Sequence, residues 1–311
     1  MDRAFVLGAG LGTRLKSLTE RLPKPLIPIY GKPLITFAFD QLIAAGAREL
    51  VINTHHCHEE YTKTFPGAEY RGARLIFEHE PILLETAGGI KNVEHHFAGQ
   101  PFVVYNGDVL TNVSVEKALA HHAASGNEVT LVLRSQGHPL HVALDAGRVV
   151  DIAGRLGVEA AQQCLFTGIY IVEPAFLRRI PPRTRISVIP LFMEMIKEGA
   201  RLGGVVLDEG VWWDLGTRES YLDVHAALAR GDFFPASGDW RKPIADTARV
   251  SPDVEIAGFL AAGPGSEIEP GAQVTDCILW EGARVLPGSV LNRCIVTAGR
   301  NATGRHTGFD F

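Results

Sequence analysis

The chain has 311 residues, of which 46% are apolar and 21% charged, and its formal net charge is −5 from 30 basic and 35 acidic side chains. Binding to nucleic acid or to an anionic membrane surface favours a basic surplus, so this composition argues against both kinds of partner. No apolar run is long enough to span a bilayer and the four cysteines contain no CxxC pair, which favours a cytoplasmic protein without disulfides or zinc.

Short β-branched runs alternate with amphipathic segments over the first 232 residues. Strands are expected at 4–7, 50–53, 75–77, 102–105, 129–133 and 165–172, and helices at 33–45, 115–125 and 188–198. This alternation predicts a Rossmann-like α/β catalytic domain over residues 1–232, with a mixed, mostly parallel sheet and helices on both faces. In such sheets ligands bind beyond the carboxyl ends of the strands.

A glycine-rich loop, LGAGLGTRL at 7–15, follows the first strand. Glycines let backbone N–H groups approach phosphates, because no Cβ blocks them. A dinucleotide fingerprint would need glycine in place of Thr13, and a P-loop would need Gly-Lys-Ser/Thr. The chain instead provides Arg14 and then Lys24, which stands between two prolines. A guanidinium fork and a lysine charge near a glycine loop suit a triphosphate.

Three further motifs follow along the chain. ETAGG occupies 85–89, Asn106-Gly107-Asp108 directly follows the strand at 102–105, and WWDLGT occupies 212–217. Taken alone, Asp108 reads as a turn or helix-capping residue, and Asp214 as a structural hydrogen-bond acceptor. Histidines at 55, 56 and 58 end a strand without a carboxylate partner pattern, so a solvated loop is favoured over a metal site.

The pattern of residues changes after a turn-rich stretch at 231–243, which we interpret as a linker. A repeat of 17 residues separates Cys277 from Cys294, and aliphatic and small residues recur at roughly six-residue spacing around it. Hexapeptide rhythm of this kind is typical of a triangular β-helix. We therefore expect a C-terminal domain over 244–311, with about three coils of a left-handed parallel β-helix at 245–300. An irregular β-rich tail is the alternative.

The full pattern, G-x-G-x-x-T-R-L followed by P-K-P-L-x-P-x-x-G-K-P, resembles the nucleoside-diphosphate-sugar pyrophosphorylase family. The likeness covers the whole chain, including the short β-helix, and it is similar to the mannose-1-phosphate guanylyltransferases of that family. It implies a sugar-1-phosphate nucleotidyltransferase (EC 2.7.7) that uses Mg²⁺, joins a nucleoside triphosphate to a sugar 1-phosphate and releases pyrophosphate.

The resemblance also implies roles for individual residues. The catalytic residues would be Arg14, Lys24 and Asp108, and Asp108 and Asp214 would hold Mg²⁺. The nucleotide would contact Leu7, Gly8, Ala9, Gly10, Gly12, Thr13, Glu85, Ala87 and Gly88. The sugar phosphate would contact Asn106, Arg155, Thr167 and Gly168. Family members commonly carry Glu-Lys-Pro after the middle strand; this chain lacks it, and Arg155 is our hypothesis for the replacement of its lysine.

Several alternatives remain at this point. GTP with mannose or heptose 1-phosphate is favoured over uridylyl transfer to a muramate- or hexose-type 1-phosphate, since the appended β-helix is common among the guanylyltransferases. A catalytically silent regulatory homologue is the main rival, an acyltransferase activity in the β-helix is a second, and a nicotinamide oxidoreductase is disfavoured. We also expect a cytoplasmic homo-oligomer with contacts through the β-helix.

Overall fold

The computed structural model describes residues 1–10, 12–232 and 242–311. The chain forms two compact units, the first made of Met1–Leu11 and Phe37–Trp212 and the second of Gly12–Thr36 and Trp213–Phe311. This division differs from the expected domains 1–232 and 244–311, because the segments 12–36 and 213–232 group with the C-terminal coils. Most of the expected linker at 231–243 lies outside the described residues.

Unit 1 is built on a ten-stranded sheet in the order β10-β11-β13-β9-β12-β7-β1-β4-β6-β5. The strands are β1 (Arg3–Leu7), β4 (Glu49–Thr54), β5 (Glu69–Tyr70), β6 (Ala73–His79), β7 (Phe102–Asn106), β9 (Val129–Arg134), β10 (Val142–Asp145), β11 (Arg148–Ile152), β12 (Gln162–Val172) and β13 (Leu202–Val206). The short strand β8 (Val109–Thr111) lies outside this sheet. All six expected strands are present, each extended by one to four residues.

The expectation of a mostly parallel sheet is wrong. Among the described strands of this sheet, parallel pairing is confined to β7-β1-β4-β6 and to β9-β13. Strand β12 runs antiparallel to both of its neighbours, β7 and β9. Strands β10 and β11 are joined by Ala146-Gly147, both with positive φ. A two-residue turn of that kind makes a hairpin, and a hairpin is necessarily antiparallel.

The helices of unit 1 are α1 (Ile35–Ala44), α2 (Glu59–Thr64), α3 (Glu85–Asn92), α4 (Val115–Ser125), α5 (Pro174–Leu177) and α6 (Val188–Lys197), with a 3-10 turn η3 at Glu94–His96. Helices α1, α4 and α6 correspond to the three expected helices, whereas α2, α3 and α5 were not expected. The hydroxyls of Ser114 and Ser187 cap α4 and α6 by accepting backbone N–H bonds, as N-cap serines do. Helix α1 starts later than expected, because Pro33 belongs to a strand, β3 (Lys32–Pro33).

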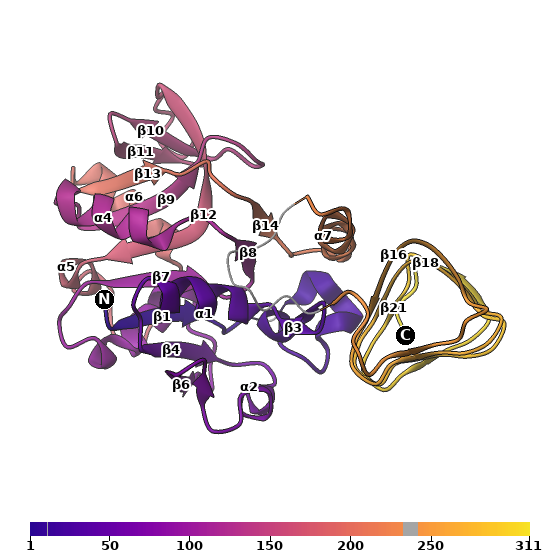
Figure 1. The fold of residues 1–311 in the computed structure, drawn as a ribbon. Coiled ribbons are helices and arrows are strands. Elements are labelled where there is room, and N and C mark those ends of the chain that lie inside the picture. The colour runs from indigo at the N-terminus through magenta and orange to yellow at the C-terminus, as the bar shows by residue number, and fades with distance from the viewer. Residues whose placement is uncertain (11, 233–241) are drawn as a thin grey trace. The chain divides into compact units, whose positions relative to one another are not determined.

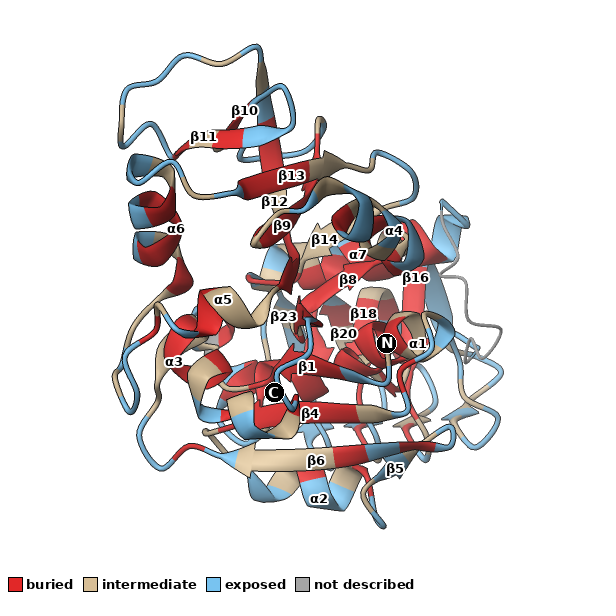
Figure 2. Ribbon diagram, turned by 90° about the vertical axis from the view of Figure 1, so that its left-hand side faces the viewer, coloured by how far each residue is buried: buried red, intermediate tan, exposed pale blue. Residues whose placement is uncertain are grey.

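A hydrophobic core fills unit 1 between the sheet and the helices. Buried side chains of β1, β7, β9 and β12 pack with those of α3, α5 and α6 in one cluster, and Figure 2 shows β1, β4 and β9 largely in the colour of buried residues. Runs of valine, leucine and isoleucine form these strands because both of their faces are covered. Among the helices that the structure describes, none has the length and apolarity needed to cross a membrane.

Unit 2 contains a stack of parallel strands that repeat every 17 or 18 residues. One ladder joins β15 (Arg249–Val250), β17 (Glu267–Ile268), β19 (Arg284–Val285) and β22 (Asn301–Ala302). The other joins β16 (Glu255–Ala262), β18 (Gln273–Leu279), β20 (Val290–Asn292) and β23 (Arg305–Thr307), with β21 (Ile295–Val296) also paired to β18. Figure 1 shows these coils stacked as triangles.

The repeat that Cys277 and Cys294 define corresponds to this stacking. Both thiols are buried and free, and burial raises the pKa of Cys277 to about 11. This environment agrees with their interpretation as small core residues. Strand pairing continues to Thr307, beyond the expected range 245–300. The left-handed sense of the coils stays a prediction.

The remaining elements of the chain are η1 (Thr13–Thr19), η2 (Lys24–Leu26), β2 (Pro28–Ile29), β14 (Trp212–Asp214) and α7 (Arg218–Arg230).

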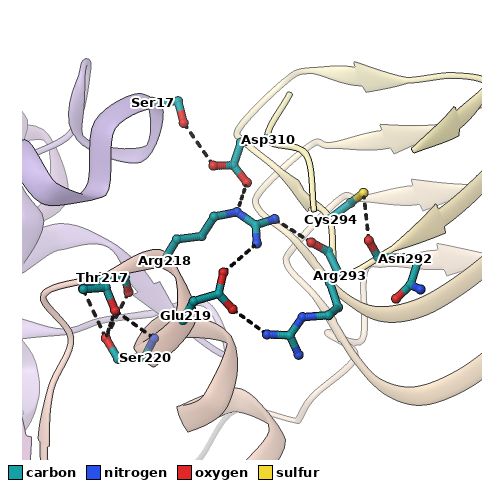
Figure 3. A network of polar contacts seen from close by, with 9 residues as sticks. All are labelled: Ser17, Thr217, Arg218, Glu219, Ser220, Asn292, Arg293, Cys294 and Asp310. Atoms are coloured by element: carbon teal, nitrogen blue, oxygen red, sulfur yellow. Dashed lines mark hydrogen bonds and ion pairs between the residues drawn. The ribbon is translucent and has the colours of Figure 1, made fainter. Parts of the chain in front are cut away.

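Polar contacts join the last coil to the rest of unit 2 (Figure 3). Asp310 accepts hydrogen bonds from Ser17 Oγ at 3.1 Å and from Arg218 Nε at 2.7 Å. Arg293 and Glu219 add an ion pair of 2.6 Å. The coil end, the start of α7 and η1 are thereby held together.

A buried histidine on α7 packs against the coils. From its pKa we predict how the stability of unit 2 changes as the pH falls. His225 is fully buried, its Nδ1 contacts the carbonyl of Tyr221 at 2.8 Å, and its ring stacks on Phe259. Burial lowers the pKa of His225 to about 4. Because the folded pKa is below the unfolded one, its contribution to stability is present above about pH 6.5 and is lost as the pH falls toward about 4, amounting to about 2–3 kcal/mol.

We therefore expect His225→Gln to lose less stability between about pH 6.5 and pH 4 than the parent chain does. Glutamine fills a similar space without titrating in this range. Denaturant titrations at a series of pH values, followed by the fluorescence of the tryptophans, measure the free energy of unfolding of each protein. Plotted against pH, these values give one slope for each protein. Equal slopes in the two proteins would show that His225 is not the titrating group.

Candidate active site

The glycine-rich loop at the end of β1 is held by hydrogen bonds inside unit 1. The amides of Gly8 and Ala9 donate to Asn53 Oδ1 at 2.9 and 3.2 Å, and Tyr61 Oη donates to the carbonyl of Gly8 at 2.9 Å. A Cβ on Gly8 would lie 2.7 Å from the carbonyl oxygen of Asn53, so that position requires glycine. A Cβ on Gly10 would meet nothing within 4 Å. The amides of Gly8 and Ala9 are thus already bonded within unit 1, and open space flanks Gly10. The contact of these residues with a nucleotide stays a prediction.

Asn53 belongs to a buried hydrogen-bond relay that the sequence analysis missed. Its Nδ2 donates to Glu80 Oε1 at 2.8 Å, and Glu80 Oε2 accepts from the amide of Leu84 at 2.9 Å. Both side chains are about 1% exposed, and burial raises the pKa of Glu80 against the opposing effect of these hydrogen bonds. The relay joins the glycine loop to the start of α3. Its only sequence signal is a polar residue near the end of the apolar strand β4.

The ETAGG segment at 85–89 forms the start of helix α3. The amides of Ala87 and Gly88 donate to the carbonyl of Ile186 at 3.0 and 3.1 Å. A Cβ on Gly88 would lie 2.4 Å from the carbonyl oxygen of Thr184, so this glycine permits close backbone packing. These contacts hold Ala87 and Gly88 against the segment 184–186, and their contact with a nucleotide stays a prediction.

Glu85 begins this helix with a positive φ of 61°. Its carboxylate pairs with Arg185 Nε at 2.9 Å, and both side chains are more than a third exposed. The Glu85 carboxylate therefore stays accessible for a ligand, and its contact with a base stays a prediction.

Asp108 lies in the turn between β7 and β8, at the same edge of the sheet as the glycine loop. Leu7 and Asn106 are register partners, and the amide of Gly107 donates to the carbonyl of Leu7 at 2.9 Å. The pKa of Tyr61 is raised by its burial and by the negative charge of Asp108, and Tyr61 itself contacts Gly8. The ends of β1 and β7 thus meet, as the parallel pairing of these strands predicts.

Thr167 and Gly168 form an irregular point in β12, where the pairing with β9 shifts register. Gly168 has a φ of +82°, and a Cβ there would lie 2.7 Å from Asn106 Nδ2, so glycine makes room for the asparagine. The hydroxyl of Thr167 is fully buried and donates to the carbonyl of Val132 at 2.8 Å. Asn106 and Gly168 therefore lie together as predicted. The Thr167 hydroxyl thus makes a structural hydrogen bond, and the contact of Thr167 with a sugar phosphate stays a prediction.

Arg155 is exposed on the turn after β11. Asp151 holds this turn by accepting the amides of Leu156 and Val158, and these bonds lower the pKa of Asp151 against the effect of its burial. Hydrogen bonds through His141 connect the turn to the start of β12. Within the described ranges, the Arg155 guanidinium has no recorded hydrogen bond or ion pair with a side chain. Its contact with a sugar phosphate stays a prediction.

Unit 2 contains the charged residues of the N-terminal motif around one carboxylate. Lys24 Nζ lies 3.1 Å from Asp214 Oδ1, and Arg14 Nη2 lies 3.5 Å from Asp214 Oδ2. The Lys24 side chain is 7% exposed, whereas that of Arg14 is 65% exposed. A Cβ on Gly216 would lie 2.4 Å from Arg14 Nη2, so this glycine leaves space for the guanidinium.

The short η2 turn positions Lys24. It lies between Pro23 and Pro25, whose rings restrict the backbone. Gly12 has a φ of +58°, and a Cβ there would lie 3.2 Å from Lys24 Cβ. Thr13 starts η1 directly after Gly12. The predicted residues Arg14, Lys24 and Asp214 are thus brought together from positions nearly 200 residues apart in the chain.

Known proteins with a similar sequence point to one family. The profile described as Nucleotidyl transferase matches residues 3–231. The mannose-1-phosphate guanylyltransferase of Mycobacterium tuberculosis is 31% identical over 299 residues, covering 93% of this chain and 83% of that protein. The N-acetylmuramate alpha-1-phosphate uridylyltransferase of Neisseria meningitidis is 30% identical over 217 residues, covering 69% of this chain and 93% of that protein.

A solved structure shares the fold. The crystal structure of HddC from Yersinia pseudotuberculosis complexed with GMP-PN aligns with a TM-score of 0.61 at 20% sequence identity. The alignment covers 73% of this chain and all of that one.

Proposed function

The chain belongs to the nucleotidyl transferase family, as a sugar-1-phosphate nucleotidyltransferase, and we propose that it transfers a guanylyl group from GTP to mannose or heptose 1-phosphate. Pyrophosphate is the second product. The observation that carries the proposal is the arrangement of Lys24 and Arg14 on the two oxygens of Asp214. Two positive charges beside a carboxylate suit the binding of a polyphosphate and a metal ion.

The two cations differ in burial, and this difference supports separate roles. The exposed guanidinium of Arg14 can reach the β and γ phosphates and stabilise charge as pyrophosphate leaves. The buried Lys24 is placed to neutralise the α-phosphate or the attacking sugar phosphate. That phosphate oxygen is already anionic and attacks the α-phosphorus in line, so the reaction needs no strong general base. The protein mainly holds the two substrates in place.

The donor chemistry of Asp108 and Asp214 fits Mg²⁺, which is a hard cation that prefers carboxylate oxygens. The Asp214 side chain is 40% exposed, and its two oxygens face Lys24 and Arg14. When bound, Mg²⁺ would supply charge neutralisation between the nucleotide and the sugar phosphate. Asp108 belongs to unit 1 and Asp214 to unit 2, and their sharing of an ion is part of the proposal.

The choice of guanine rests on the likeness to mannose-1-phosphate guanylyltransferases. The relative from Mycobacterium tuberculosis is 31% identical over 93% of this chain, and the uridylyltransferase from Neisseria meningitidis is 30% identical over 69% of it. Uridylyl transfer to a muramate- or hexose-type 1-phosphate is the second candidate, because that relative is almost as similar in the region it shares. A silent regulatory homologue is disfavoured, since Arg14, Lys24, Asp108 and Asp214 are all present.

Pyrophosphate release tests the proposal directly. The chain is assayed with Mg²⁺, each nucleoside triphosphate and a panel of mannose, heptose, glucose and N-acetylmuramate 1-phosphates. We expect GTP with mannose or heptose 1-phosphate to be the best pair, and Asp108→Asn to abolish the signal. Asp145→Asn, at an exposed strand end, is the matched control and should stay active. Preference for UTP would select the second candidate, and silence with retained nucleotide binding would support the regulatory homologue.

Arg155→Ala tests the proposed sugar side of the site. We expect the KM for the sugar phosphate to rise about 10–100-fold, the value of one charge-assisted hydrogen bond, with little change in the KM for the nucleotide. Steady-state kinetics with each substrate varied in turn measure both constants. Arg178→Ala, also exposed, is the control. Equal effects on the two KM values would contradict the assignment.

A further inference from the structure

A second cluster of ligand-type side chains lies in unit 1 and has no part in the proposed reaction. Glu78 on β6 and His95 and His96 in η3 each offer one ligand atom, and these three atoms all lie within 4.8 Å of one another. His96 Nε2 is 2.6 Å from Glu78 Oε1, and His95 Nε2 is 3.9 Å from the same oxygen. The sequence gives no spacing signal for this group, unlike the histidines at 55–58.

A hydrogen bond holds the His95 ring in the orientation that is usual for a histidine bound to a metal. Its Nδ1 lies 3.1 Å from the carbonyl oxygen of Asn92, which selects the tautomer with the proton on Nδ1. The lone pair is then on Nε2, the atom directed at Glu78. A histidine that ligates a metal almost always donates its other N–H to a carbonyl or carboxylate in this way. This contact is an observation independent of the clustering itself.

The three atoms need little movement to enclose an ion. Zinc is bound by histidine nitrogen and carboxylate oxygen at about 2.0–2.2 Å, so its ligand atoms lie about 3–4 Å apart. The imidazoles of His95 and His96 lie with centroids 4.0 Å apart and planes at 39°, and the side chain of His95 is 64% exposed. The ion would take the place of the contact between His96 Nε2 and Glu78 Oε1, and water could fill a fourth position.

We propose that Glu78, His95 and His96 form a binding site for one divalent transition-metal ion of the zinc type. Two imidazoles and a carboxylate suit this class of ion better than Mg²⁺, which prefers oxygen ligands alone. The site lies apart from the predicted magnesium carboxylates Asp108 and Asp214 in the sequence, and it does not depend on the proposed reaction.

The position of the ligands in the chain gives the ion a structural consequence. Glu78 is followed by Glu80 of the buried relay and by the whole of helix α3, and the two histidines come directly after that helix. An ion held at both ends would close this segment into a loop and stabilise the folded over the unfolded chain by mass action. The segment includes Glu85, which is a predicted nucleotide contact, so the ion would help to hold that residue in place.

Zinc binding to the full chain, freed of metal with a chelator and carrying no histidine tag, tests the proposal. Competition with a chromophoric chelator should give one Zn²⁺ per chain. Each of Glu78→Gln, His95→Ala and His96→Ala should weaken binding at least about tenfold, while His138→Ala, on an exposed loop, should not. Circular dichroism confirms that the variants are folded.

Two further readouts separate a built site from incidental binding. Zn²⁺ should raise the thermal midpoint of the parent chain and leave that of His95→Ala unchanged, and Co²⁺ should give the absorption of a low-coordinate complex in the parent chain only. The proposal is overturned if the parent chain fails to bind Zn²⁺ when the metal and the chain are present at equal concentrations. It is also overturned if His95→Ala binds Zn²⁺ as tightly as the parent chain does.

Discussion

Asp214→Asn should lower kcat by about a thousandfold while the chain remains folded. The change removes the negative charge between Lys24 and Arg14 and one of the two carboxylates proposed to hold Mg²⁺. Loss of a single preorganised electrostatic group at a reacting centre costs about 100- to 1000-fold in kcat, and the variant loses both a metal ligand and the partner of two cations. Asparagine keeps an oxygen that can accept the hydrogen bond of Lys24.

The measurement is kcat for pyrophosphate release at saturating substrates, repeated over a range of Mg²⁺ concentrations. Asp223→Asn is the matched control, because Asp223 is an exposed carboxylate on α7 of the same unit. It should retain full activity. If Asp214→Asn keeps kcat within about fivefold of the parent at every Mg²⁺ concentration, then Asp214 does not hold the ion and the proposed mechanism fails.

Asn53→Ala should destabilise unit 1 by about 2–4 kcal/mol and raise the KM for the nucleotide. The variant removes the acceptor of the Gly8 and Ala9 amides and the donor to Glu80, all in a region that is almost completely buried. Each buried group left without a partner costs about 1–3 kcal/mol. The glycine loop loses its anchor at the same time, so nucleotide affinity should fall together with stability.

The loss should also depend on pH. Burial already raises the pKa of Glu80, and without the Asn53 donor it should rise further. A group whose folded pKa is raised contributes stability below its unfolded pKa and loses it as the pH rises through the folded value. Asn53→Ala should therefore be more destabilising at about pH 8 than at about pH 5.

Denaturant unfolding at the two pH values measures this effect, and steady-state kinetics measure the KM. Asn301→Ala, which removes an exposed asparagine, should be neutral in both experiments. An Asn53→Ala variant as stable as the parent at both pH values would show that water replaces the relay, and the relay would then have no role in holding the loop.

Much of the candidate site could be predicted from local sequence. The grouping of Arg14 and Lys24 with Asp214 was expected from their motifs, and the structure brings the three side chains together within unit 2. The meeting of the glycine loop with Asp108 followed from parallel strand order. Asn53 and Glu80 could not be predicted in this way, because a single polar residue at a strand end has no distinctive spacing.

The glycines show that a motif residue can also have a packing role that its motif does not reveal. Gly8 and Gly88 were expected to contact the nucleotide, and the structure adds that each is required by the close approach of another backbone segment. That approach involves Asn53 for Gly8 and Thr184 for Gly88. Sequence spacing does not show which distant segment packs against a glycine.

The sequence by itself determined the features that depend on neighbouring residues. Strand positions follow from runs of β-branched residues, helix starts from capping residues such as Ser114 and Ser187, and the coil repeat from the 17-residue spacing of Cys277 and Cys294. These preferences act over a few residues, so they can be read along the chain.

Only the tertiary structure decided which way β12 runs, which amides are already bonded, and that Glu78 lies beside His95 and His96. Each of these depends on contacts between residues far apart in sequence, and the free energy of such a contact is set by packing and burial. Short-range sequence preferences do not determine that free energy.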